Sequence, residues 1–218
     1  MSRWNSFPHA NSDYLYEGEK LLESWSDLHR GDRVEFPDDD WVEQTLEQYP
    51  EAAPDDFDGD VSALAATIQD AWRCFHSGDF QKAVQLSEQC GHLAHSPANK
   101  AAGVYATNLE PDEAKQQACY LAAIDRAEAA IEALPDDPNS HYFHAFNLGR
   151  YSQSISIVKA LSQGIGGKIQ SSLKSALEFQ ADHAEAHTAV GMYQAEIINK
   201  VGKKLGKMTY GASAGKAI

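Results

Sequence analysis

The stretch Gly78-Asp79-Phe80-Gln81-Lys82-Ala83-Val84 joins two segments that both have the apolar spacing of helices. Glycine permits a tight turn, and an aromatic side chain after it can fill the groove between two helices. Ala83 is small enough to let those helices approach closely. The stretch therefore predicts a pair of packed helices between Ala65 and Ala94, with the first helix ending near Ser77.

More helices are predicted toward the C-terminus, over 98–109, 112–134, 139–161 and 168–179, with a last one from Ala184. The alternation typical of strands is absent from this part of the sequence. We therefore expect an all-α protein in which residues 61–218 form a right-handed solenoid of αα-hairpins. The last helix lacks a second helix, which predicts either a longer array or a homo-oligomer that covers its apolar stripe.

The Gly-Asp-aromatic turn with its following alanine resembles the turn inside a tetratricopeptide repeat. Ala176-Leu177-Glu178-Phe179 and Val190-Gly191 stand where that family has its helix-ending tetrad and its close helix crossing. The corresponding positions Leu148 and Val190 are 42 residues apart, against about 34 in the family. The segments 141–151 and 191–201 are similar to divergent members, namely the T-component of bacterial TRAP transporters and the regulator of microtubule dynamics family. The T-component is exported and this sequence shows no export signal, so its function is not carried over.

Residues 1–60 differ from the rest in composition. They hold 17 acidic and 4 basic residues, and seven aromatic side chains between Trp4 and Trp41. Short helices are predicted over 17–29 and 41–49, the second capped by Asp40, followed by a linker with Pro50 and Pro54. We expect an irregular acidic arm that packs in pieces against the repeat domain.

Several classes of function are disfavoured by composition. The net charge of −14 argues against nucleic acid as the partner, and no run of apolar residues is long enough to cross a membrane. Three widely spaced cysteines without a CxxC pair, and no secretory signal, predict a cytoplasmic protein without a cofactor. The tripeptide Arg30-Gly31-Asp32 matches an adhesion motif, but three residues recur by chance.

The sequence contains no supported catalytic set, so we expect a scaffold that is not an enzyme. It would bind an extended peptide or a partner helix in a concave groove. The side chains predicted to line this groove are polar or aromatic: Tyr105, Asn108, His144, Asn147, Arg150, Tyr151, Gln194 and Asn199. A basic patch for an acidic partner is predicted at Lys200, Lys203, Lys204 and Lys207.

Two alternatives remain open at this stage. Histidines lie at the starts of successive repeats, and imidazoles at spacings of three and four can bind zinc, nickel or copper. This alternative makes the protein a small-ligand or metal-binding protein through His141, His144, His183 and His187. The second alternative is that the protein is an accessory subunit whose acidic arm inhibits its own groove.

Overall fold

The computed structural model describes residues 3–202, and all regular structure among them is helical. The predicted all-α class is therefore confirmed. In chain order the α-helices are α1 (Lys20–Leu28), α2 (Asp39–Gln48), α3 (Val61–His76), α4 (Phe80–Ser87), α5 (His95–Asn108), α6 (Glu113–Ala133), α7 (Pro138–Gln153), α8 (Ile157–Ser162), α9 (Ile165–Phe179) and α10 (Ala184–Val201). Short 3₁₀ turns lie at Ser12–Tyr14, Pro50–Ala52 and Gly91–Ala94.

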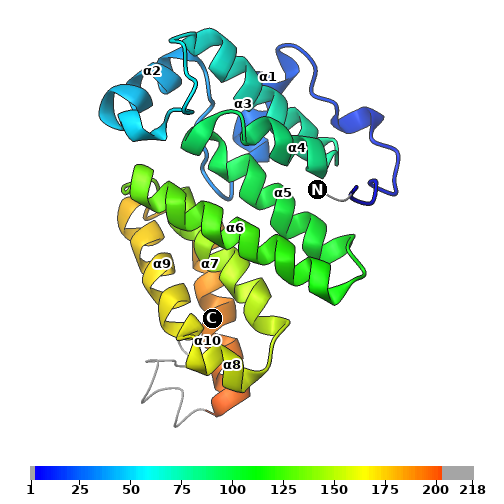
Figure 1. Ribbon diagram of the computed structural model, residues 1–218, viewed down its shortest axis with the longest axis vertical. Helices are drawn as coiled ribbons and strands as arrows, with labels where there is room; N and C mark the ends of the chain where they lie inside the picture. Colours follow the sequence, from blue (N-terminus) through cyan, green and yellow to red (C-terminus); the bar gives the residue numbers. More distant parts are fainter. Residues whose placement is uncertain (1–2, 203–218) are drawn as a thin grey trace.

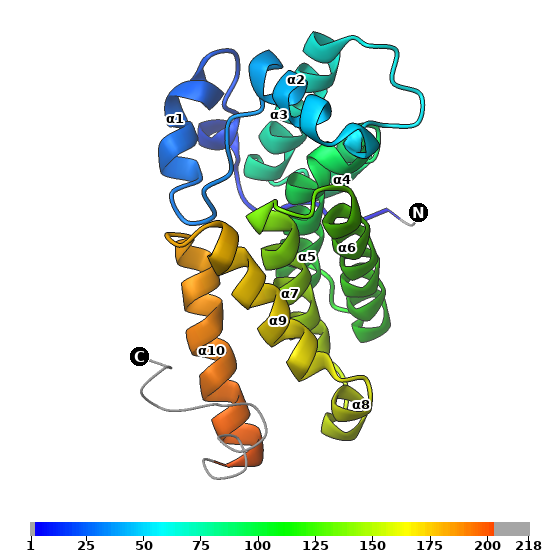
Figure 2. The same ribbon diagram turned by 90° about the vertical axis from the view of Figure 1, so that its left-hand side faces the viewer.

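The helices are stacked along the long axis of the molecule (Figure 1). α1 to α4 occupy one end, α5 and α6 the middle, and α7 to α10 the other end (Figures 1 and 2). From α3 onward each long helix packs mainly on the next, in the order α3, α4, α5, α6, α7, α9 and α10. The finer description of this stack as a right-handed solenoid stays a prediction.

Three apolar clusters follow the stack. The first joins Leu21, Trp25 and Val42 of α1 and α2 to Ile68 and Trp72 of α3, so the acidic first sixty residues share a core with the helices that follow. The second lies between α4, α5 and α6, and the third between α6, α7, α9 and α10. Apolar side chains are therefore buried along the whole stack. Each Å² of apolar surface removed from water stabilises the fold by about 25 cal/mol.

The turn at residues 78–84 has the predicted features. Gly78 has φ +84°, a conformation that favours glycine, and the carboxylate of Asp79 accepts a hydrogen bond from the N–H of Lys82. Phe80 and Ala83 are buried between the helices. A second close approach occurs at Gly103 of α5, where a Cβ atom would lie 2.4 Å from Cε1 of Phe146 on α7.

Aspartates begin five of the helices. Asp38, Asp60, Asp79, Asp112 and Asp137 are the N-caps of α2, α3, α4, α6 and α7, and each accepts a hydrogen bond from a backbone N–H of the first turn. Such caps satisfy otherwise unpaired N–H groups and each stabilise by about 1 kcal/mol. The predicted cap of α2 was wrong, because Asp38 and not Asp40 receives the bond, from Trp41 at 2.9 Å.

The helix predicted over 139–161 is interrupted. α7 ends at Gln153, and α8 restarts the helix at Ile157 after Ser156, whose hydroxyl accepts from the N–H of Lys159. Local side-chain hydrogen bonding by serine competes with the helical ladder, which explains this break. α5 begins three residues earlier than predicted, since Pro97 lies in its first turn, where a missing N–H costs nothing.

Candidate functional site

A groove of about 410 Å³ lies between the last four helices. α7, α8, α9 and α10 all contribute side chains to it, and most of these are apolar. The main apolar residues are Tyr142, Ala145 and Phe146 of α7, Ile157 and Leu161 of α8, Ile165, Ile169 and Leu173 of α9, and Ala189, Met192 and Ile197 of α10. The volume lies in the range of about 300–1,000 Å³ that is usual for ligand sites.

Three side chains of this groove are apolar, large and open to solvent. Ile157, Leu161 and Met192 are 48%, 52% and 55% exposed. Val158, on the same short helix α8, is 77% exposed. Scattered apolar residues on a surface need no explanation, but a gathering around a concavity is typical of a site that another molecule covers.

Polar contacts hold the walls of the groove in place. The hydroxyl of Tyr193 on α10 donates to the carbonyl of Gly166 on α9 at 2.9 Å. The side-chain amide of Gln153 donates to Glu196 at 3.0 Å, which connects the end of α7 to α10. The guanidinium of Arg150 lies over the ring of Phe146, with 5.5 Å to the ring centre. Arg150 is thereby placed at the groove as a cationic side chain.

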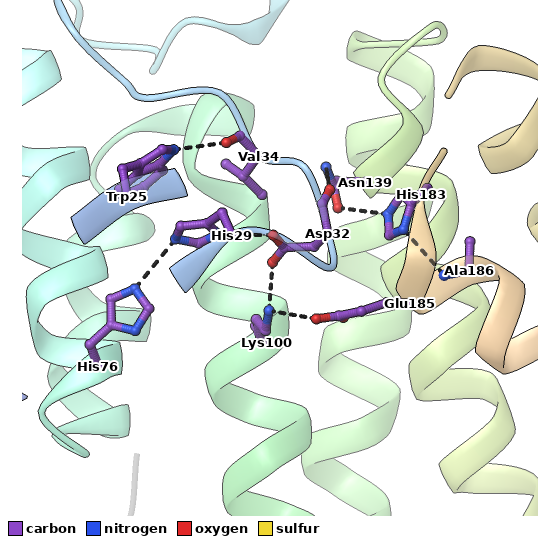
Figure 3. A network of polar contacts seen from close by, with 10 residues as sticks. All are labelled: Trp25, His29, Asp32, Val34, His76, Lys100, Asn139, His183, Glu185 and Ala186. Carbon is purple, nitrogen blue, oxygen red and sulfur yellow. Dashed lines mark hydrogen bonds and ion pairs between the residues drawn. The ribbon is translucent and has the colours of Figure 1, made fainter. Parts of the chain in front are cut away.

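The first turn of α10 is anchored to the loop that follows α1 (Figure 3). The N–H of Glu185 donates to the carbonyl of Gly31 at 3.1 Å, and its carboxylate accepts from Lys100 of α5 at 3.2 Å. Arg33 forms an ion pair with Asp182 just before α10. Glu185 also lines the groove, so one residue joins the groove wall to the loop and to α5.

Asp32 is the centre of this junction. Its side chain is 1% exposed and lies 2.5 Å from Nζ of Lys100 and 2.9 Å from Nδ1 of His29. Burial alone would raise the pKa of Asp32, but the hydrogen bond from His29 and the charge of Lys100 outweigh it, so the pKa lies well below its usual value. Since its carboxylate is enclosed, Asp32 serves an internal junction, and the tripeptide Arg30-Gly31-Asp32 does not present its acidic side chain at the surface.

Two histidines continue the junction toward α3. His29 donates from Nδ1 to the carboxylate of Asp32, and its Nε2 shares a hydrogen bond with Nε2 of His76 at 3.3 Å. Burial, together with the nearby His29 and Lys100, lowers the pKa of His76 to about 3. Both rings pack against Trp72, which contributes to the burial of His76.

On the other side, His183 is the N-cap of α10. Its Nδ1 accepts from the N–H of Ala186 at 3.2 Å, and its Nε2 lies 3.2 Å from Oδ1 of Asn139 (Figure 3). The amide of Asn139 donates in turn to the backbone carbonyl of Asp32 at 3.0 Å. Burial lowers the pKa of His183, which keeps the ring in the neutral form that this cap requires.

The structure places the predicted groove residues at several different locations. Arg150 alone among them lines the groove described above. Five have buried side chains within the helical stack, which removes them from direct contact with a partner: Tyr105, His144, Asn147, Tyr151 and Gln194. Asn108 and Asn199 are exposed. The repeat pattern identified the helices but not the faces that stay open.

The four histidines proposed as metal ligands are not brought together. Among residues 3–202 no group of three or more His, Cys, Asp or Glu side chains is arranged to hold a metal ion. His144 and His183 already use both ring nitrogens, His144 with Ser172 and Glu128. His141 and His187 each bond a carbonyl just before their own helix, at Pro135 and Ala181. Capping and packing therefore account for these side chains, and the predicted histidine site is not supported.

The predicted basic patch cannot be placed. Lys203, Lys204 and Lys207 lie outside the described residues, and the side chain of Lys200 is not described either. None of the helices in the described part of the chain is long and apolar enough to span a membrane.

Sequence reasoning missed the apolar residues that line the groove. A signal existed in Ser156-Ile157-Val158-Lys159-Ala160-Leu161, where apolar residues follow a serine that can cap a helix. It also missed the pairing of Asp32 with Lys100, which are 68 residues apart and share no local pattern. Comparison of the chain with protein-family models, curated proteins and solved structures finds no match.

Proposed function

We propose that this protein is a non-enzymatic binding module that takes the apolar face of a partner helix or peptide in the groove between α7, α8, α9 and α10. The supporting observation is the open apolar surface of Ile157, Leu161 and Met192 around a concavity of about 410 Å³. Helix-in-groove recognition uses this combination, with apolar anchors at helical spacing. Arg150 and Glu196 at the groove would contribute orientation through polar contacts.

The groove volume also favours a second candidate, a small apolar molecule. The two candidates differ in what covers α8. A small molecule would fill the cavity alone, whereas a helix would also cover Val158, which is 77% exposed beside it.

The test begins with the dye 1-anilinonaphthalene-8-sulfonate, which fluoresces in apolar sites. The wild-type protein should bind it, and the double variant L161E/M192E should not. The matched control is L22E on α1, because Leu22 is as exposed as Met192, at 55%. Dye binding that survives in L161E/M192E would contradict an accessible groove.

Selection from a library of helix-forming peptides then separates the two candidates. Peptides selected on the wild type should carry apolar residues at i, i+3 or i+4, and i+7, and should bind L22E but not L161E/M192E. A groove that binds the dye but selects no peptide would favour the small molecule. Selected peptides that bind L161E/M192E equally well would overturn the helix-binding proposal.

A further inference from the structure

Residues 3–8 form neither helix nor strand and lie against α4 and α5 (Figure 1). The residues that this segment contacts, among them Gln81, Tyr105 and Leu109, do not line the groove described above. Residues 8–15, which connect it to the following helices, are all exposed. Residues 3–8 are therefore held in place by their own contacts and not by burial of the connecting residues 8–15.

Trp4 stacks on Tyr105 of α5. The ring centres are 4.0 Å apart and the planes are 12° from parallel. Tyr105 is 1% exposed, since Trp4 covers it from outside. The backbone N–H of Trp4 donates to Oε1 of Gln81 on α4 at 3.0 Å. A backbone hydrogen bond therefore holds the segment in addition to the stacking of the ring.

Asn5 makes two hydrogen bonds to the end of α5. Its backbone N–H donates to the hydroxyl of Tyr105 at 3.2 Å, and its side-chain amide donates to the carbonyl of Leu109 at 3.0 Å. Carbonyl groups at a helix C-terminus lack a partner within the helix. Asn5 thus supplies a donor to a group that the helix leaves available.

Phe7 lies over the turn between α3 and α4. A Cβ atom on Gly78 would lie 2.6 Å from Cγ of Phe7, so only glycine leaves room for this ring. The ring meets Phe80 edge to face, with centres 6.4 Å apart. Glycine is therefore required at position 78 for two reasons: the backbone has a positive φ there, and the ring of Phe7 occupies the space of a Cβ atom.

These contacts are those of an extended peptide bound to a surface: two aromatic anchors three residues apart, with an asparagine between them that bonds to the helix backbone. We propose that the surface formed by Gly78, Phe80, Gln81, Tyr105 and Leu109 is a peptide-binding site for the pattern Trp-Asn-x-Phe. Residues 4–7 are its resident occupant, and a partner protein that carries the same pattern displaces them. The tether gives the resident segment a high effective concentration, so a free peptide competes poorly until the resident segment is weakened.

The test uses the full chain with the double substitution W4A/F7A and a fluorescein-labelled synthetic peptide of residues 2–10. Fluorescence anisotropy should show binding to W4A/F7A with a Kd at least about tenfold lower than for the wild type, whose own segment competes. A peptide with Asn5 replaced by alanine should bind W4A/F7A about tenfold more weakly, because it loses the amide bond to Leu109. Equal binding to the wild type and to W4A/F7A would overturn the proposal, as would no binding to a folded W4A/F7A.

Circular dichroism gives the control for folding. If W4A/F7A loses its helical signal, the milder full-chain variant N5A, which keeps both aromatic anchors, replaces it and should show a gain over the wild type of up to about tenfold. If both variants unfold, the segment is part of the core and not a displaceable ligand, and the proposal fails.

Discussion

The junction around Asp32 and the groove between α7 and α10 share Glu185, yet they are opposite in character. The junction encloses ionised groups and gives each an opposite charge or a hydrogen bond: Asp32 meets Lys100 and His29, and Lys100 also meets Glu185. The groove leaves Leu161 and Met192 more than half exposed. Enclosed charges cost free energy unless they are paired, and open apolar side chains forgo the stabilisation of burial.

The difference shows which of the two regions serves the fold. The junction joins the loop after α1 to α3, α5, α7 and α10, so its removal would separate segments far apart in the sequence. The walls of the groove are held by Tyr193 and Gln153 at the edges, and Ile157, Leu161 and Met192 are exposed to another molecule.

The largest effect should come from removing one charge of the junction. K100M leaves the carboxylate of Asp32 buried without the ammonium group that pairs with it, and breaking a buried pair in this way costs about 3 kcal/mol. Urea unfolding measures it. D32N/K100M should lose less than the two single variants together, because no unpaired charge remains. R30A, whose ion pair with Asp27 is about three-quarters exposed, is the control and should change stability little.

A smaller effect follows from pH. The pKa of His76 is about 3 in the folded protein, against 6.5 as the ordinary value, so below pH 6.5 the unfolded state binds a proton that the folded state does not. Stability should therefore fall as the pH is lowered from 6.5 to 5, with His76 contributing up to about 2 kcal/mol of this fall. H76Q should have a flatter stability profile over this window. Parallel profiles for H76Q and the wild type would show that His76 does not contribute.

The next largest effect on stability is expected from removing the N-cap of α8. S156A removes the acceptor for the N–H of Lys159 and should destabilise this six-residue helix by about 1 kcal/mol. Hydrogen exchange at the amides of α8 should become faster while the amides of α5 stay protected. S162A, at the other end of α8, removes a side-chain bond to the carbonyl of Lys159 without removing a cap, and it should have the smaller effect.

The smallest effect on stability is expected in the groove itself. L161E/M192E places charge on side chains that are already exposed, so the free energy of unfolding should change by only about 0.5 kcal/mol. The urea midpoint measures this. A loss of more than about 2 kcal/mol would mean that these side chains belong to the core, and the contrast between the two regions would be lost.

The local parts of the fold were predictable from the sequence. Gly78, Phe80 and Ala83 mark a turn between packed helices because each requirement lies within a few residues. Helix ends were predicted less accurately. Asp38 and Asp40 are equally good caps by type, and the choice depends on where the chain enters α2.

The tertiary parts were not predictable in the same way. His144 and His183 each belong to a pair of histidines with the spacing of ligands, but Ser172 and Asn139, distant in sequence, already bond their nitrogens. Tyr105 was predicted to face a partner and does receive an aromatic ring, but the ring is Trp4 of the same chain. Periodicity identifies helices and says little about which neighbour covers a given face.

The aspartates that begin α2, α3, α4, α6 and α7 have one more consequence. Each acts through a single side-chain oxygen, a role that serine or asparagine fulfils nearly as well. Asp38, Asp60, Asp79 and Asp112 could therefore lose their negative charges one at a time with little change to the helices, whereas the carboxylate of Asp137 also pairs with the buried His95. The acidity of this protein and its architecture are in this respect separable properties, and solubility could be tuned through the same residues that start its helices.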